Sequence, residues 1–402
     1  MNRRLTLAIV AMGAAQAAVY IARPVTSYRL VGIGEGPGAV GVVTAAFALI
    51  PLFAAIPLGR FADRTRSGPL LVIGCALQAA ACLALGVVES TAALAAATAV
   101  LGIGHLGLAL AVQHVIARES DESQHDQRFA VMTVAVSLGQ LVGPLLAGAL
   151  LSEHAGSLTA ASGRAMFVAA GIAVLATAAA VGAAVGEPEP SQGEVAEARR
   201  DRVRDILRVR GVPAGIFASV AVLSAADVIT AYLPLLGEQR GIDPAVVGVL
   251  LAVRAAASIA ARIGIGPVVR RAGRIRVIAL SMAAAAVAIG AVTLTEESAV
   301  LVLLMAVAGY GLGFGQPLSM TMVVQRVPRQ AAATALAVRL SGNRLGQVAA
   351  PAVAGLVSGR VGVDAVFWML AAMLLVATVA VRGVTDRAPP PVPAPDLQAP
   401  AE

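Results

Sequence analysis

The chain has 402 residues, of which 58% are hydrophobic and 13% are charged, and its mean hydropathy is +0.83. A soluble protein needs more charge than this to cover its surface, so the composition excludes a soluble enzyme or binding domain and indicates a protein that lies in a lipid bilayer. The net charge of +7 comes from 30 arginines without a single lysine. These arginines lie between apolar segments, whereas a nucleic-acid-binding protein gathers its basic residues on one soluble face.

Twelve apolar segments follow one another along the chain, and each is close to the ~20 residues that cross ~30 Å of hydrocarbon as a helix. They predict an all-α membrane protein with spans at 5–30, 38–58, 69–88, 92–117, 129–151, 165–185, 211–236, 245–265, 276–294, 298–324, 331–357 and 363–382. The first span follows Arg3 and Arg4 and therefore also has the form of a signal peptide, but eleven further spans favour a retained first helix.

A polar interval in the middle of the chain divides the spans into two groups of six. The domains predicted from it are an N-terminal six-helix bundle at 1–185, a central loop at 186–210, a C-terminal six-helix bundle at 211–382 and a disordered, proline-rich tail at 383–402. In the central loop, Val203, Ile206 and Leu207 recur at helical spacing. This pattern predicts a short amphipathic helix on the membrane surface, with a solvated basic linker as the alternative.

The positions of the arginines predict the orientation of the spans. Most arginines lie at the N-terminus, at the even-numbered connections and in the central loop, whereas the odd-numbered connections hold several acids and only Arg29, Arg164, Arg240 and Arg360. Basic residues are enriched on the cytoplasmic side of membrane proteins. We therefore expect a multi-pass protein of a bacterial-type cytoplasmic (inner) membrane, with both termini and the central loop in the cytoplasm.

The two groups of spans repeat each other at a constant offset of 207 residues. The matching positions are Gly41 with Gly248, Gly59 with Gly266, Gly102 with Gly309, Gly104 with Gly311, Gly139 and Gln140 with Gly346 and Gln347, Pro144 with Pro351, and Gly148 with Gly355. Because six helices return the chain to the side on which it started, this is a parallel repeat about an axis normal to the membrane, as in secondary transporters. Two such bundles that rock about a central site would give alternating access.

The segment Gly59-Arg-Phe-Ala-Asp63-Arg64-Thr-Arg66, at the end of the second span, resembles the loop signature of the major facilitator superfamily. The resemblance implies the fold of that family, with two pseudo-symmetric six-helix bundles, and a conformational latch at Gly59, Asp63 and Arg64. In the family, this aspartate contacts the cytoplasmic end of a helix in the other half, where a carboxylate gains from the helix dipole. The second copy has Arg270 in place of Asp63, so it implies no matching latch. Topological anchoring is the alternative for these charges.

The fifth span contains Gly139-x-x-x-Gly143-Pro144-x-x-x-Gly148, which resembles the antiporter signature of the drug:proton exporter branch, without its usual second glycine after the proline. A Gly–Pro pair permits a helix bend, and the glycines permit close helix packing. The resemblance favours export over import, and ordinary packing is the alternative. Another signature of drug exporters, an arginine early in the fourth span, is absent, and Thr98 stands near that position.

Polar residues inside the spans are candidates for a substrate and proton pathway, because they are costly in hydrocarbon and usually face a cavity or a partner. Gln16, Tyr20 and Arg23 share one face of the first span. Asp227, in the seventh span, is the repeat equivalent of Tyr20 and the only acid well inside a span. The superfamily lines its cavity with helices 1, 4, 7 and 10, so both faces would look inward. Asp227 is either a proton carrier, since a buried carboxylate can exchange protons near neutral pH, or a structural ion-pair partner. The candidate ion-pair partners are Arg23, Arg254 and Arg344.

The other ionisable and aromatic candidates each have two interpretations. Arg254 and Arg344 are intramembrane cations without matching acids, which hints at an anionic group on the substrate, unless they bind helix carbonyls. His105 could titrate, but a neutral histidine bonded to a neighbouring helix is favoured. Tyr310 and Phe314 share a face of the tenth span and could stack on substrate or serve packing alone.

Together these patterns predict a secondary active transporter of a small organic solute, namely a proton-coupled exporter of a drug or metabolite that works as a monomer in the lipid bilayer. One alternative is a proton-coupled importer of a small metabolite, including an anionic one, and another is a non-transporting receptor or scaffold. The sequence contains no nucleotide-binding loop, nucleophile constellation or metal-binding cluster. It therefore predicts no enzyme activity, cofactor, metal site or nucleic-acid partner.

The predicted orientation can be tested by labelling single cysteines in a background that lacks Cys75 and Cys82. An impermeant thiol reagent added to intact cells should label a cysteine at Glu297 and leave one at Ser191 unlabelled, because the two positions are expected on opposite sides of the membrane. Labelling of both positions from outside would contradict the twelve-span topology.

Overall fold

The structure is a computed structural model that describes residues 3–64, 66–119, 125–152, 157–185, 203–328 and 331–384, and every regular element in these residues is a helix. The first half contains α1 (Arg3–Gly32), α2 (Pro37–Arg64), α3 (Ser67–Val87), α4 (Thr91–Glu119), α5 (His125–Ser152) and α6 (Leu158–Ala184). The second half contains α8 (Val212–Gln239), α9 (Pro244–Ile263), α11 (Arg274–Ala291), α12 (Ser298–Val324), α13 (Ala332–Val361) and α14 (Val363–Arg382). The short elements are α7 (Val203–Arg208), α10 (Ile265–Ala272) and the 3₁₀ helix η2 (Val292–Leu294).

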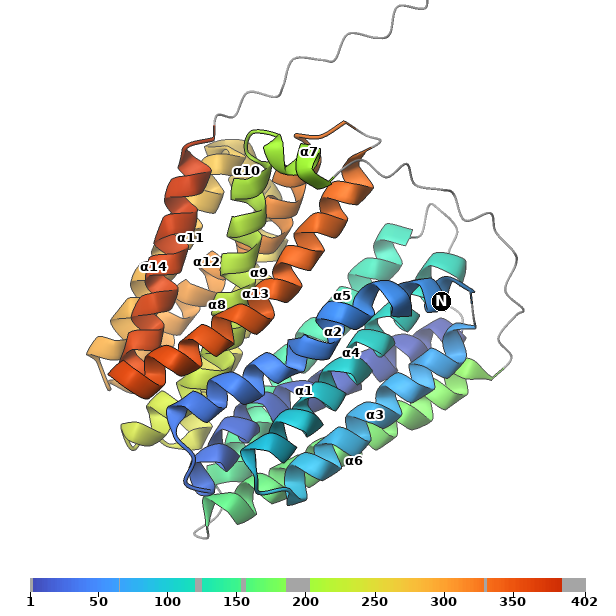
Figure 1. Cartoon of the computed structure of the whole chain (residues 1–402), viewed down its shortest axis with the longest axis vertical. Coiled ribbons are helices and arrows are strands. Elements are labelled where there is room, and N and C mark those ends of the chain that lie inside the picture. Colours follow the sequence, from blue (N-terminus) through green and yellow to red (C-terminus); the bar gives the residue numbers. More distant parts are fainter. Residues whose placement is uncertain are drawn as a thin grey trace, which may run out of the picture.

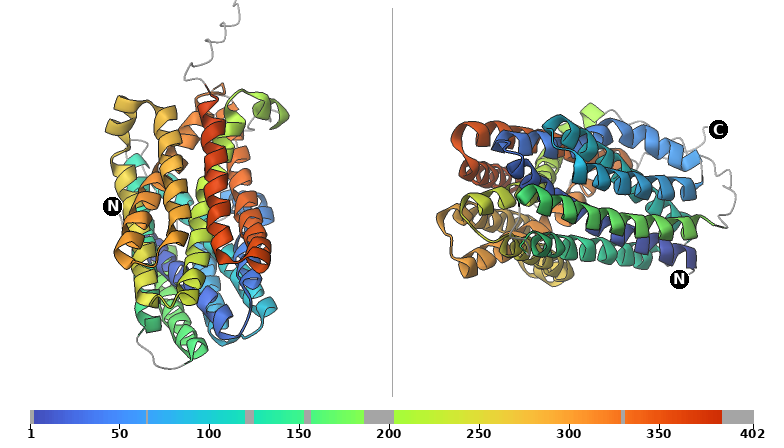
Figure 2. Two further views of the ribbon diagram at one scale, coloured as in Figure 1. Left: turned by 90° about the vertical axis from the view of Figure 1, so that its left-hand side faces the viewer. Right: turned by 90° about the horizontal axis from the view of Figure 1, so that it is seen from below.

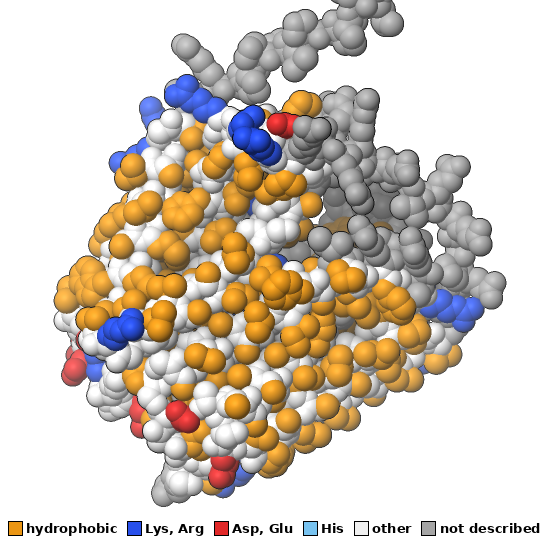
Figure 3. Space-filling view, viewed as in Figure 1, with side chains coloured by type: hydrophobic (Ala, Val, Ile, Leu, Met, Phe, Trp, Pro, Cys, Tyr) orange, Lys and Arg blue, Asp and Glu red, His pale blue; other side chains and the backbone are white. Residues whose placement is uncertain are grey.

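Each of the twelve predicted spans forms a long helix. Eleven of the described helices are long and apolar enough to cross a membrane. The twelfth, α13, has 30 residues but is more polar, because it carries Arg339, Asn343, Arg344 and Gln347. The face of the molecule seen in Figure 3 is largely apolar, and basic side chains gather at its rims, as expected of a surface that faces lipid.

Two short helices refine the predicted spans. The eighth span ends earlier than predicted, because α9 stops at Ile263 and α10 forms a separate helix after a break at Gly264. Within the predicted central loop, residues 203–208 form α7, and its buried Ile206 packs with Val212, Val323 and Ala335. The remainder of that loop, 186–202, and the tail from residue 385 lie outside the described residues.

The packing within the first half is repeated in the second. In the first half, α1 packs against α5 and α6, and α3 packs against α4 and α6; the equivalent pairs α8 with α13 and α14, and α11 with α12 and α14, pack in the second half. A Cβ atom on Gly102 would lie 1.8 Å from the carbonyl oxygen of Phe47, and one on the equivalent Gly309 would lie 2.1 Å from that of Arg254. The same close backbone contact therefore occurs twice, which explains why glycine recurs at this offset.

The two halves meet through a second pair of equivalent glycine contacts. A Cβ atom on Gly41 in α2 would lie 2.5 Å from the Cα atom of Gly355 in α13, and one on Gly148 in α5 would lie 3.1 Å from that of Gly248 in α9. We call this the closed end; it carries the connections α1–α2, α5–α6, α8–α9 and α13–α14. The two bundles diverge from there toward the end at which α1 begins and α14 finishes (Figure 1). Seen from below, the first half extends to one side and the second half to the other, and they overlap in the middle (Figure 2).

Two arginines that depart from the predicted charge asymmetry serve the closed end. Arg29 is only 2% exposed, and its guanidinium donates to the carbonyl oxygens of Val88 at 2.9 Å and Thr159 at 3.3 Å. In the second half, Arg240 donates to the carbonyl oxygens of Val292, Thr293 and Thr295 and pairs with Asp364. A cation beside the last carbonyls of a helix is favoured by the helix dipole. These two arginines therefore cap the ends of α3 and α11.

The glycine contacts between the halves predict a selective effect of Gly148→Ala. Its Cβ atom would lie 2.6 Å from the carbonyl oxygen of Pro244, whereas a Cβ atom on Gly171 would meet nothing within 4 Å. We expect Gly148→Ala to weaken the closed end by about 1–3 kcal/mol and so to lower the melting temperature. The control Gly171→Ala should be neutral or slightly stabilising. Equal behaviour of the two variants would contradict this role for Gly148.

Candidate functional site

An ion pair joins the two halves in the interior of the molecule. The Nη1 atom of Arg23 in α1 lies 2.7 Å from Oδ1 of Asp227 in α8, and the two side chains are 10% and 9% exposed. The other carboxylate oxygen accepts from Nε2 of Gln347 in α13 at 2.7 Å, and Gln347 in turn accepts from Arg344 at 3.1 Å. Asp227 is the only buried acid among the described residues. Of the three candidate partners Arg23, Arg254 and Arg344, Arg23 is the one that contacts the carboxylate directly, and both carboxylate oxygens are satisfied.

Aromatic rings surround the Arg23 side of this ion pair. The guanidinium carbon of Arg23 lies 5.2 Å from the ring centroid of Phe47 and 5.9 Å from that of Tyr20. The Phe47 ring in turn lies 5.8 Å from that of His105 in α4. Cation–π contacts of this kind stabilise an arginine that is removed from water. Helices α1, α2 and α4 therefore all contribute to holding Arg23.

Arg254 in α9 reaches the same region from the second half. Its Nη2 atom donates to Thr230 Oγ1 at 3.3 Å, and Tyr20, Asp227 and Arg23 lie near enough to interact with it electrostatically. The repeat makes this arrangement intelligible, because Thr230 is the equivalent of Arg23 and Arg254 is the equivalent of Phe47. The same two repeat positions are therefore in contact in each half. In the first half the arginine is on the first helix of the pair, and in the second half it is on the second helix. We call Tyr20, Arg23, Asp227, Arg254, Arg344 and Gln347 the polar cluster.

Several buried polar atoms near the polar cluster have no hydrogen-bond partner within the described part of the chain. They are Gln16 Oε1, Thr98 Oγ1, His105 Nδ1, Ser224 Oγ and Arg254 Nε. Arg23 and Thr98 line a cavity of about 20 Å³, together with Thr26 and Phe47. A space of this size holds roughly one water molecule. Buried polar groups are normally satisfied, so this concentration of open donors and acceptors is typical of a site that binds water or a ligand.

A second polar network, in the interior of the second half, could not be predicted from sequence spacing. Arg339 donates to the carbonyl oxygen of Gln316 at 3.0 Å and to its Oε1 at 2.7 Å. Ser219 Oγ donates to Asn343 at 2.8 Å, and Gln316 Nε2 donates to the Ser219 carbonyl at 2.7 Å. These contacts tie α8, α12 and α13 together. The weak signal in the sequence was the polar face that Arg339 and Asn343 share on α13.

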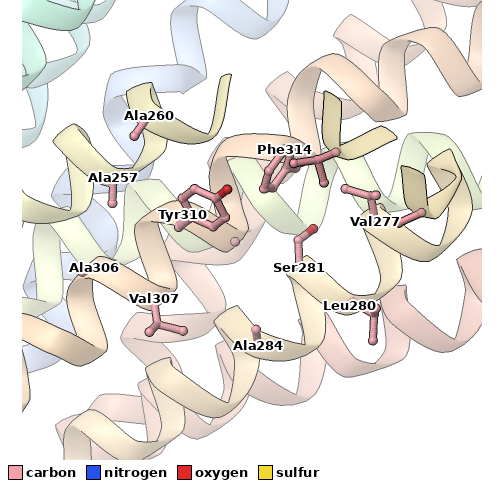
Figure 4. A pocket seen from close by; sticks show the side chains of 13 residues that line it. Ala257, Ala260, Val277, Leu280, Ser281, Ala284, Ala306, Val307, Tyr310 and Phe314 are labelled. Atoms are coloured by element: carbon pink, nitrogen blue, oxygen red, sulfur yellow. The ribbon is translucent and has the colours of Figure 1, made fainter. Parts of the chain in front are cut away.

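The structure places Tyr310 and Phe314 apart from the polar cluster. Their rings form an edge-to-face pair at 5.1 Å, and they line a groove of about 620 Å³ between α9, α10, α11 and α12 (Figure 4). The other lining residues are mainly alanine and valine, and the polar cluster contributes none. The predicted shared face therefore exists, but it turns toward the neighbouring helices of the second half rather than toward Asp227.

The two motifs that carried the family resemblance differ in what the structure describes of them, because one packs against neighbouring helices and the other lies partly outside the described residues. Gly139 and Gly143 pack directly against α1, where added Cβ atoms would lie 2.8 Å from the Ala17 nitrogen and 2.7 Å from Tyr20 Cβ, and Gly148 packs against α9. The helix-bend motif thus lies in close contact with both halves. A Cβ atom on Gly59 would meet nothing within 4 Å, and the side chains of Asp63 and Arg64, on which the predicted latch depends, lie outside the described residues.

Two repeated helical bundles with a buried ion pair at their junction are typical of a secondary transporter. A family model described as the Major Facilitator Superfamily matches residues 5–243 and again 215–401, so the chain belongs to that superfamily and is a secondary transporter. No curated protein sequence matches the chain.

Several solved structures of transporters share the fold at low sequence identity. They include a nucleoside transporter, NupG (14% identity, 95% of this chain and 99% of that chain, TM-score 0.75), and a POT family transporter in complex with a thioalcohol-conjugated peptide (13%, 94% and 95%, 0.76). A bacterial homologue of the human lysosomal transporter Spinster, in an inward-facing and unoccupied conformation, is also similar (15%, 95% and 95%, 0.67). At these identities the likeness establishes the fold alone.

Proposed function

We propose that this protein is a proton-coupled transporter of a small organic solute, in which Asp227 carries the coupling proton. The observation that carries the proposal is the 2.7 Å ion pair between Arg23 in one half and Asp227 in the other. A charged carboxylate holds Arg23 and so favours the arrangement of halves in this structure. A proton on Asp227 removes that attraction, because the pair loses its charge on one side, and shifts the equilibrium toward other arrangements.

The contacts of Asp227 suit a group that changes its charge. Gln347 and Arg344 continue the hydrogen-bond chain from Asp227 into α13, so protonation at one atom would be felt by three helices. His105 is the second candidate for proton transfer, because its Nδ1 atom is buried without a partner among the described residues and its ring contacts Phe47. The match to the Major Facilitator Superfamily supports a transporter rather than an enzyme.

Export of a drug or metabolite is the first candidate direction, supported by the resemblance of the Gly139–Gly148 segment to an antiporter signature. Import of an anionic metabolite is the second, favoured by the excess of arginine over acid in the polar cluster. We further propose that the monomeric protein spans the cytoplasmic (inner) membrane with both termini in the cytoplasm. In that orientation the closed end faces outward and this structure is open toward the cytoplasm.

The substitution Asp227→Asn tests the proton carrier directly. If Asp227 carries the proton, the variant in reconstituted vesicles should lose pH-driven solute accumulation or extrusion. It should retain downhill exchange of substrate, because the two halves can still move relative to each other with substrate bound. A matched control, Arg339→Gln, removes another buried arginine and should leave the pH dependence of flux intact.

If Asp227 is only a structural partner, the Asn variant leaves Arg23 buried without its counter-charge and should lose about 3–5 kcal/mol of stability. Its thermal unfolding should then be restored in part by the double substitution Asp227→Asn and Arg23→Gln. Full proton-driven transport by a well-folded Asp227→Asn protein would rule out the proposed carrier.

A further inference from the structure

The polar cluster holds more positive than negative charge. Arg23, Arg254 and Arg344 supply three guanidinium groups, and Asp227 is the single buried acid among the described residues. Asp227 contacts Arg23 directly and Arg344 through Gln347, whereas the nearest described partner of Arg254 is the neutral hydroxyl of Thr230. An intramembrane cation without a counter-charge is costly. The cluster is therefore short of an anion.

Two buried hydrogen-bonding positions in the second half are open, one on α9 and one on α8. Arg254 is 7% exposed, and its Nε atom has no partner among the described residues. Ser224 Oγ, three residues before Asp227 on α8, is also buried without a partner and lies close to Gly346 of α13. A guanidinium nitrogen and a hydroxyl are both donors that suit an oxyanion.

The repeat explains why two arginines approach this place from opposite sides. Arg23 lies on the first helix of one half and contacts Phe47, which is the repeat equivalent of Arg254. Arg254 lies on the second helix of the other half and contacts Thr230, which is the repeat equivalent of Arg23. The two planar guanidinium groups, one from each half, lie near enough to interact electrostatically, and a movement of the halves would separate them.

We propose that Arg23 and Arg254 form the binding site for an oxyanion group of the transported solute, a carboxylate or a phosphate, and that the Asp227 carboxylate occupies Arg23 when this group is absent. The inference rests on the proposed transport function and names its substrate class. The solute's oxyanion would accept hydrogen bonds from both arginines, while Asp227 gives up its contact with Arg23.

This arrangement links the proton to the anion. A charged Asp227 competes with the solute for Arg23, and a protonated one does not, so anion binding should strengthen as pH falls. The ionisable groups that interact electrostatically with Asp227 from the helices around it are Tyr20 and Arg23 of α1, His105 of α4, Arg254 of α9 and Arg344 of α13, and Arg262 of α9 lies near Tyr20. Proton and anion would then bind together, which favours movement of both in one direction and hence the import candidate.

The test measures binding of acetate, benzoate and inorganic phosphate to the purified full chain, as the rise in melting temperature over chloride at equal ionic strength, at pH 5.5 and pH 8. We expect at least one probe to stabilise the wild type more than chloride does, and more at pH 5.5. Stronger stabilisation by acetate or benzoate would identify the bound group as a carboxylate, and stronger stabilisation by phosphate would identify it as a phosphate. Arg254→Gln should weaken the apparent affinity roughly tenfold or more, the loss of one charge-assisted hydrogen bond, and Arg339→Gln should not.

Asp227→Asn separates this inference from the proposed function. It should raise the affinity for the anion and remove its pH dependence, because Arg23 is then free at every pH, whether or not Asp227 is the proton carrier in flux assays. If Arg254→Gln does not fold, Arg254→Lys, which keeps the charge without the planar fork, should bind the probe with intermediate affinity. No stabilisation beyond chloride by any probe at either pH, or equal loss in Arg254→Gln and Arg339→Gln, would overturn the site.

Discussion

A carboxylate in the middle of a membrane protein requires a counter-charge, and the structure places that counter-charge in the other half of the molecule. Asp227 belongs to α8 and Arg23 to α1, so the requirement that buried charges be paired becomes a requirement that the two bundles stay together at this point. A salt bridge within one half would stabilise that half alone. Because this one spans the junction, any change in its charge alters the relative free energies of the arrangements that the halves can adopt.

The glycine contacts at the closed end complement the ion pair. Gly41 against Gly355 and Gly148 against Gly248 bring backbones together without side-chain interlocking, so they hold the halves through shape and dispersion. Such contacts are not specific to one charge state. The closed end can therefore act as a surface on which the bundles meet or part, while the polar cluster determines which state is favoured. The two glycine contacts are equivalent because the repeat relates them, so they lie symmetrically on either side of the pseudo-twofold axis.

Much of the fold could be predicted from the sequence, because lipid imposes a simple rule on length and hydropathy. The spans and the offset of 207 residues follow from residue types and spacing, whereas the sequence left the role of Asp227 open and offered three arginines as its partner. The features that could not be predicted depend on how each helix is rotated about its axis and on contacts between residues far apart in the sequence. Tyr310 and Phe314 share a face of α12, but the pattern does not say toward which neighbour that face turns. Arg29 and Arg240 depart from the charge asymmetry because they cap carbonyls far along the chain.

We infer that a proton on Asp227 releases the contact between the halves. This release can be measured by pulsed electron paramagnetic resonance between spin labels at Glu89 and Glu296, repeat-related positions in exposed connections of the two halves, in a background without Cys75 and Cys82. Lowering the pH from 8 to 5.5 should lengthen the distances in the wild type, and Asp227→Asn should show the low-pH distribution at both values. A pH-dependent distribution that survives unchanged in Asp227→Asn would contradict it.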